Sequence, residues 1–213
     1  GDITVVAPGF LQVQDYYGVI GYAPGAQAFG IYVTGGEGGV DLTNSGTISV
    51  DGGYVAGIEV QSSGDIGVSN SGDIVAGSGL QYYYNATNYY TYYFGTQVAT
   101  GINATSNGEG ASVDVTNSGD INVENTALLY YAASGIVAFA GNGDAIADNS
   151  GDINAVSSYS ATGIDARGFG DATVENSGAV YANGGKYAFG VYATAGTGDV
   201  SITNTDDGEI GFY

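Results

Sequence analysis

The sequence predicts an all-β protein, a right-handed parallel β-helix (solenoid) of about six rungs with three strands in each rung. Two recurring strings and the alternating pattern between them carry this prediction. The first string, Asn-Ser-Gly-x-Ile/Val, begins at Asn44, Asn70, Asn117, Asn149 and Asn176, with a degenerate copy at Asn204. The opening Gly1-Asp2-Ile3 is the same element without its Asn-Ser. Internal repeats of this size are typical of solenoids and other stacked arrays.

A second string, Gly-Ile/Val-x-Val/Ala, lies inside each repeat. Its copies begin at Gly30, Gly57, Gly101, Gly135, Gly163 and Gly190. A third segment, with apolar residues at alternate positions, leads into each Asn, as Val113 and Val115 do before Asn117. Apolar residues at i and i+2 point to one side of a strand. Each repeat is therefore expected to hold three short strands separated by glycine-rich corners.

A unit of three short strands cannot bury its own apolar face. Stacking the units about 4.8 Å apart lets every strand pair with its copies on either side, which gives a solenoid. The alternative is an antiparallel sandwich or barrel, for which hairpin turns such as Asn-Gly are expected between alternating runs. One repeat departs from the pattern, because Ala145 and Ala147 take the inward positions and Ile146 the outward one. Either the register slips there or Ile146 covers a neighbouring loop.

Composition limits the function classes for this chain of 213 residues, which is expected to form one domain over 1–213. The net charge is −20, and Arg167 and Lys186 are the only basic residues, so nucleic acid is not an expected partner. The chain has no Cys and no His, which excludes disulfides and thiolate metal sites. No apolar run approaches the roughly 20 residues of a membrane helix, so direct membrane insertion is not expected. A chain without Met that begins at Gly1 is expected to be a processed product or a fragment.

The Asn-Ser-Gly-x-Ile string, followed by Gly-Ile-x-Ala and a Val-x-Val-x-Asn strand, resembles the passenger-domain β-helix repeats of bacterial autotransporter-type surface adhesins. The resemblance extends over nearly the whole chain. It implies a right-handed solenoid that is secreted to the extracellular side or the cell surface, with an adhesive or filamentous role. It leaves open whether the chain is a released passenger, an excised piece or a free subunit.

The asparagines of the first string share one phase of the repeat. They are expected to form a structural ladder, in which each Asn is buried at a corner and its side-chain amide bonds its neighbours and the turn backbone. The ladder comprises Asn44, Asn70, Asn117, Asn149, Asn176 and Asn204.

Acidic residues recur at two corners. Asp73, Asp120 and Asp152 follow Asn-Ser-Gly, with Asp2 in phase, and a second set contains Asp144, Asp171 and Asp199. Like charges one rung apart repel, so either water solvates them or cations bridge them. Asp144, Asp171 and Asp199 are the candidate weak cation sites, with calcium as the cation, and no other cofactor is expected.

No enzymatic activity is expected. Paired carboxylates can hydrolyse a glycoside, but such pairs are inevitable when acidic corners stack. The chain has no histidine base and no thiol nucleophile, and Arg167 alone does not make the cationic cluster that a polysaccharide lyase uses.

Extra residues are inserted in the first, third and fourth repeats, at about 7–28, 78–98 and 125–133, and are expected to emerge at one edge of the solenoid. Tyrosine is large, stiff and amphipathic, which suits a contact surface. The alternative is that these loops fold back over the solenoid edge. The aromatic residues of the predicted contact surface are Tyr16, Tyr17, Tyr82, Tyr83, Tyr84, Tyr89, Tyr90, Tyr92, Tyr93, Phe94, Tyr130 and Tyr131.

Two functions follow as hypotheses. The first is an extracellular structural protein whose copies stack end to end in a surface filament or layer, through Ile3, Val5, Ile210 and Phe212. It depends on the shared phase of the first and last repeats and on the absence of a polar capping repeat, which would leave strand edges open. The second is an adhesive passenger domain that binds host or matrix carbohydrate or protein through the Tyr-rich edge.

Overall fold

The computed structural model of the chain describes residues 1–6, 10–14, 20–24, 27–77, 81–85, 90–94, 98–125, 132–205 and 207–212. Side chains are described for residues 1–5, 27–77, 98–125, 132–205 and 207–211. Within these ranges the regular secondary structure consists of β-strands, and no helix is long and apolar enough to span a membrane.

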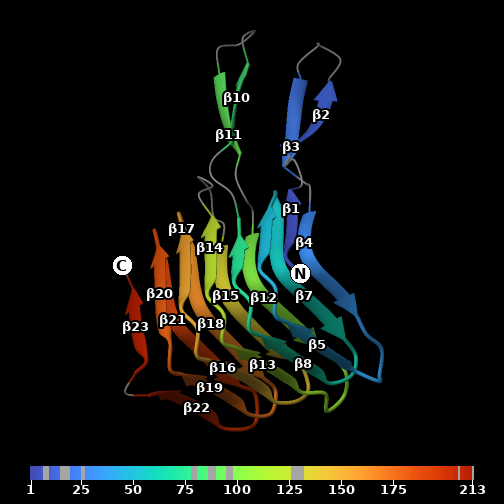
Figure 1. Cartoon of the computed structure of the whole chain (residues 1–213), viewed down its shortest axis with the longest axis vertical. Helices are drawn as coiled ribbons and strands as arrows, with labels where there is room; N and C mark the ends of the chain where they lie inside the picture. Colours follow the sequence, from blue (N-terminus) through green and yellow to red (C-terminus); the bar gives the residue numbers. More distant parts are fainter. Residues whose placement is uncertain are drawn as a thin grey trace.

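The strands return to the same three parallel sheets in a fixed cycle (Figure 1). Sheet 1 contains, in order, β1 (Ile3–Val6), β6 (Ile48–Asp51), β9 (Ile74–Ala76), β14 (Ile121–Asn125), β17 (Ile153–Ser157), β20 (Ala179–Gly184) and β23 (Glu209–Phe212). Sheet 2 contains β4 (Gln27–Thr34), β7 (Tyr54–Ser62), β12 (Val98–Ser106), β15 (Ala132–Ala140), β18 (Ser160–Gly168) and β21 (Tyr187–Ala195). Sheet 3 contains β5 (Val40–Asn44), β8 (Ile66–Asn70), β13 (Val113–Asn117), β16 (Ala145–Asn149), β19 (Ala172–Asn176) and β22 (Val200–Asn204).

Each passage of the chain through sheets 1, 2 and 3 is one turn, so six turns lead from β1 to β23 and the termini lie at opposite ends of the stack (Figure 1). The predicted parallel solenoid is confirmed, and the antiparallel sandwich is wrong, because every pairing in the three sheets is parallel. Register is kept throughout. Ile146 pairs with Asp114 and faces outward, while Ala145 and Ala147 are buried, so no slip occurs there.

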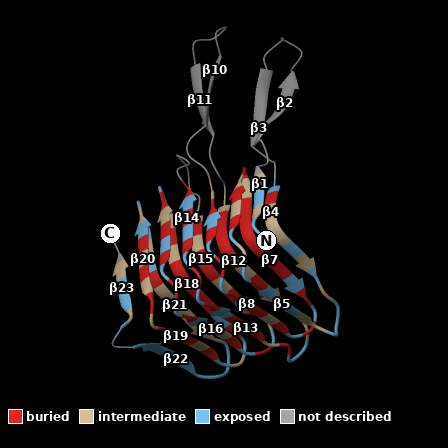
Figure 2. Ribbon diagram, viewed as in Figure 1, coloured by how far each residue is buried: buried red, intermediate tan, exposed pale blue. Residues whose placement is uncertain are grey.

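A ladder of branched apolar side chains forms the centre of the core. The register partners Ile48, Ile74, Ile121, Ile153 and Val180 of sheet 1 are buried. Along most strands burial alternates with exposure, as the period-two pattern predicted (Figure 2).

The glycine of the second string marks a bend in each strand of sheet 2. In β7, Gly57 and Ile58 are consecutive and both face the core, which a pleated strand allows only where it bends. A Cβ atom on Gly57 would lie 2.3 Å from Cγ2 of Ile74, so a larger residue does not fit. The bend therefore packs directly on the isoleucine ladder of sheet 1.

Two antiparallel pairs interrupt the cycle. Strands β2 (Phe10–Gln14) and β3 (Ile20–Pro24) pair with each other, as do β10 (Gln81–Asn85) and β11 (Tyr90–Phe94). Both pairs, and the 125–133 insertion, fall between a strand of sheet 1 and the next strand of sheet 2. The three insertions thus leave the solenoid at the same corner of its cross-section.

Candidate functional site

The asparagines of the first string form a continuous hydrogen-bonded ladder along the end of sheet 3, as predicted. The Nδ2 amide of each of the first five asparagines donates to Oδ1 of the Asn on the next rung, at 2.7 Å from Asn44 to Asn70 and 2.8 Å from Asn117 to Asn149. The same amide donates to a carbonyl oxygen of the following turn, at 2.7 Å from Asn117 to Gly119. Both hydrogens of the amide are used, as a buried structural ladder requires.

Burial of this ladder stops at its last member. The first five asparagines are buried, but Asn204 is exposed, so the expectation that each member is buried is wrong for Asn204. Its strand, β22, is an edge strand of sheet 3. Asn204 still accepts from Asn176 at 2.8 Å and donates to the carbonyl of Gly208 at 2.6 Å.

The stacked acidic residues accept hydrogen bonds from the backbone of the next rung. Oδ1 of Asp73 accepts from the amide of Asp120 at 3.1 Å, and Oδ1 of Asp120 accepts from the amide of Asp152 at 3.1 Å. At the second corner, Oδ1 of Asp144 accepts from the amide of Asp171 at 2.8 Å. These carboxylates therefore accept hydrogen bonds from backbone N–H groups at the corners. This structural role differs from both predicted roles, which were solvation by water and bridging by cations.

Two of the three candidate cation residues, Asp144 and Asp171, share this role. Asp171 accepts from the amide of Asp199 at 2.8 Å, so Asp144 and Asp171 each have one oxygen on the backbone. Among the described residues, no group of three or more acidic side chains is placed to hold a metal ion.

Five residues of the predicted tyrosine surface lie outside the described residues. Tyr16, Tyr17, Tyr89, Tyr130 and Tyr131 are in this class. The others belong to β10 and β11, where the backbone pairs Tyr82 with Tyr93 and Tyr83 with Tyr92. Their side chains are outside the described set. These residues are Tyr82, Tyr83, Tyr84, Tyr90, Tyr92, Tyr93 and Phe94.

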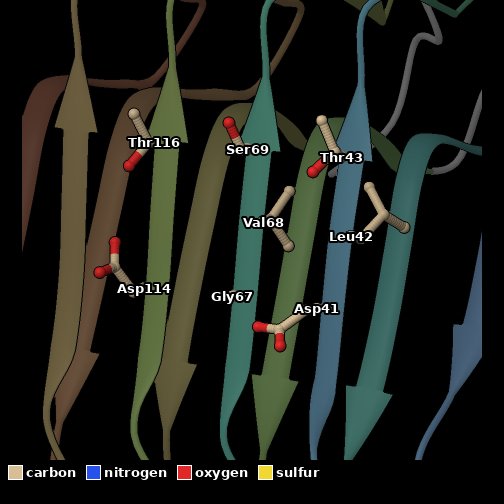
Figure 3. A pocket seen from close by; sticks show the side chains of 8 residues that line it. All are labelled: Asp41, Leu42, Thr43, Gly67, Val68, Ser69, Asp114 and Thr116. Carbon is tan, nitrogen blue, oxygen red and sulfur yellow. The ribbon is translucent and has the colours of Figure 1, made fainter.

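A pocket of about 340 Å³ opens on the outer face of sheet 3 (Figure 3). Gly67 has no side chain, and the gap that it leaves lies between Asp41 and Asp114 of the neighbouring strands. The hydroxyl side chains of this pocket are Thr43, Ser69 and Thr116. It offers hydrogen-bond acceptors and hydroxyl groups on an open, acidic face. Burial raises the pKa of Asp114, and the charge of Asp148 on the next rung adds to the rise.

The outer face of sheet 2 carries a second distinctive feature at its bend. On β4 the rings of Phe29 and Tyr32, three residues apart, have centroids 5.0 Å apart, so the bend brings the outward side chains together. On β21 the register equivalents Phe189 and Tyr192 are 5.8 Å apart. These two pairs and their register partners on the four strands between are called the bend face.

Between the two aromatic pairs the bend face carries no aromatic residue. The register partners of Phe29 and Phe189 are Ala56, Thr100, Ser134 and Thr162. The partners of Tyr32 and Tyr192 are Glu59, Asn103, Val137 and Asp165. Asn103 donates to Glu59 at 3.0 Å, and Arg167 pairs with Asp165. The hydrogen bond to Asp165 raises the pKa of Arg167, whose guanidinium also lies 5.2 Å from the centroid of the Tyr192 ring.

Exposed apolar side chains gather on the end rungs. Of the large apolar side chains that are exposed in the described part of the chain, seven lie on the first turn, the last turn or β23: Tyr32, Tyr187, Phe189, Tyr192, Val200, Ile202 and Ile210. Val200 and Ile202 are each 50% exposed, although their partners Ala172 and Val174 one rung earlier are fully buried. Among the predicted stacking residues, Ile3 and Val5 are partly buried, Ile210 is 38% exposed, and the side chain of Phe212 is outside the described set.

The bend-face aromatics were missed by the sequence reasoning, although a signal was present. The first repeat reads Ala-Phe-Gly-Ile-Tyr at 28–32 and the last reads Ala-Phe-Gly-Val-Tyr at 188–192, whereas no inner repeat has an aromatic residue at either position.

Comparison with known proteins adds no relative: no protein-family model, no curated protein and no solved structure matches the chain.

Proposed function

We propose that this chain is an extracellular structural protein, a solenoid subunit whose end rungs stack on those of other copies in a surface filament or layer. The observation that carries the proposal is the exposure of core-phase residues on the last turn. Val200 and Ile202 occupy positions that are buried on every inner rung, yet each is 50% exposed here. Covering them with another rung removes this apolar surface from water.

Open backbone edges support the same proposal. Strands β21 and β22 are edge strands at one end of sheets 2 and 3, and β4 and β5 are edge strands at the other end. An edge strand presents unpaired N–H and C=O groups, which are a template for pairing with another chain.

The negative charge of the chain opposes this assembly, so the assembly should depend on the salt concentration. A net charge of −20 makes copies repel one another, and salt screens this repulsion over about 8 Å at physiological ionic strength. We therefore expect association to increase with salt, which separates it from association driven by opposite charges.

The test compares two single charges on the same edge strand. Both residues are exposed on β22. Ile202 is in register with buried core residues of the inner rungs, whereas Ser201 lies on the outward side of the strand. Ile202→Asp should abolish concentration-dependent association in sedimentation velocity, and electron microscopy should show no fibres. Ser201→Asp should leave association largely intact. A wild-type chain that stays monomeric at high concentration and moderate salt would overturn the proposal.

The adhesive function, and with it the likeness to autotransporter passengers, stands as a second proposal. It is favoured by the position of all three insertions at one corner and by the tyrosine-rich sequences of β10 and β11. Carbohydrate or protein is the ligand class that such aromatic residues suit.

A further inference from the structure

We propose that the copies join head to tail in one register, with Phe29 and Tyr32 of one copy packed against Phe189 and Tyr192 of the copy before it, and that β23 is displaced at each junction. This inference rests on the proposed stacking and deepens it. It specifies the residues, the polarity and the axial repeat of the contact.

The distribution of aromatic residues on the bend face is the first argument. Both aromatic pairs lie on edge strands of sheet 2, and the four strands between them carry no aromatic residue at these positions. If β4 of a second copy follows β21 in the register that all inner neighbours keep, Phe29 falls beside Phe189 and Tyr32 beside Tyr192. Identical rings on adjacent parallel strands then stack, as like side chains do in other in-register ladders.

The direction of the asparagine ladder is the second argument. Nδ2 of each of the first five asparagines donates toward the C-terminal end of the stack, and Oδ1 of each of the last five accepts from the N-terminal side. In the same register, β5 of the second copy follows β22, and Asn204 can donate to Oδ1 of Asn44. The ladder then continues without interruption. A head-to-head contact would place acceptor against acceptor, so the ladder favours head-to-tail polarity.

The strand count imposes displacement. Sheet 1 has seven strands, whereas sheets 2 and 3 have six. When β4 and β5 of the second copy follow β21 and β22 directly, β1 of that copy falls on the level that β23 already occupies. One of these two strands must leave. The alternative keeps both strands and leaves a missing rung in sheets 2 and 3.

Side-chain size indicates which strand leaves. In the row that runs from Val5 to Phe212, the inner members are Val50, Ala76, Val123, Ala155 and Ala182, all of them buried. Val5 fits this row, whereas a phenylalanine inside it would overpack the core. We therefore assign β1 of the incoming copy to the shared level, and β23 acts as a cover for the free end.

Cysteine crosslinking tests the register, because the chain has no cysteine of its own. Within one copy Tyr32 and Tyr192 are separated by five strand spacings, about 24 Å, so a Tyr32→Cys/Tyr192→Cys disulfide forms only between copies. At the proposed junction the two positions are neighbours about 4.8 Å apart, within disulfide range. Oxidation should give a ladder of covalent multimers. The control pair Gln27→Cys/Tyr192→Cys, displaced along the strand by five residues, should give none.

The outcomes separate this inference from the proposed function. Wild-type protein that never associates overturns the stacking itself. Association without the 32–192 crosslink, or with an unchanged critical concentration in Phe189→Ala/Tyr192→Ala, overturns only the register. We expect that double variant to raise the critical concentration about tenfold. If the aromatic pairs bind a carbohydrate and their replacement leaves association unchanged, the proposed register is likewise overturned.

Strand displacement has its own readout. Ile210→Asp loosens β23 and should speed assembly, whereas Ile3→Asp weakens the incoming β1 and should slow it. The axial repeat of fibres should be about 29 Å, six rungs, if one strand is displaced, and about 34 Å, seven rungs, if both stay. Equal slowing by the two variants, or the longer repeat, would overturn the displacement.

Discussion

Gly101 packs so closely on Ile121 that a Cβ atom at residue 101 would lie 2.4 Å from Cγ2 of the isoleucine. The same added Cβ atom would lie 2.6 Å from the carbonyl oxygen of Gly135, on the next rung. Neither neighbour can move freely, because one belongs to the core ladder and the other to the backbone of sheet 2. The glycine of the second string is therefore a requirement of packing between two sheets.

We expect Gly101→Ala to lower the free energy of unfolding by about 1–3 kcal/mol, the range of overpacked cores. Urea titration followed by circular dichroism measures it. Gly36→Ala is the matched control, since a Cβ there meets no atom within 4 Å, and it should change stability by no more than about 0.5 kcal/mol. Similar effects of the two substitutions would contradict the packing explanation.

Asn117→Ala should lower the free energy of unfolding by about 1–3 kcal/mol, because its buried partners Asn70 and Asn149 lose hydrogen bonds. The same substitution at Asn204, which is exposed on the edge strand, should cost less than Asn117→Ala in monomeric protein. Urea titrations at low protein concentration compare the two. A larger loss at residue 204 would mean that the ladder does not stabilise the inner rungs.

At an acidic corner, the effect of the charge on stability can be separated from the effect of the hydrogen-bond acceptor. Asp171→Asn keeps an acceptor for the amide of Asp199 and removes a repelling charge, so its melting temperature should be unchanged or higher. Asp171→Ala loses the acceptor and should cost about 0.5–1.5 kcal/mol. A chelator should leave the wild-type melting temperature unchanged. A fall with chelator would instead indicate that cations bridge the corner.

Stability should respond to pH at Asp114. Burial raises its pKa in the folded protein, with a smaller contribution from Asp148, so the folded state binds this proton more tightly than the unfolded state does. The ionised carboxylate therefore costs stability at neutral pH, and the cost disappears as the pH falls below the unfolded value of about 3.9. Asp114→Asn should accordingly be more stable than wild type at pH 7, with no gain from relief of this ionisation below about pH 4. A gain of equal size at both pH values would exclude this origin.

Replacing Tyr89, Tyr90, Tyr92 and Tyr93 with Ser should weaken adhesion or assembly and leave the melting curve of the solenoid unchanged. A surface rich in exposed tyrosine is expected to mark a contact site. Circular dichroism and a binding assay on immobilised glycans or matrix protein measure the two effects. Loss of folding would show that this insertion covers the solenoid.

The phase of the asparagines already determined the architecture. Because Asn117, its copies and the apolar residues before them recur at fixed offsets, in-register stacking is the arrangement that buries every apolar face and pairs every amide. The sequence also predicted that the insertions at 7–28, 78–98 and 125–133 interrupt the same connection, since the span between the first and second strings varies far more than the span from the second string to the next Asn. These inferences needed only the two-residue period of a strand.

Tertiary structure alone decided what the outward side chains do. Phe29 and Tyr32 are three residues apart, a spacing that would separate them on a straight strand, and the bend at Gly30 brings their rings together. The acceptor role of Asp73 likewise depends on a corner amide one rung away and 47 residues distant in the chain. Local pattern reports which face of a strand is apolar. Bends and rung-to-rung distances depend on how glycine backbone packs against side chains from another sheet, and this contact is absent from any one repeat.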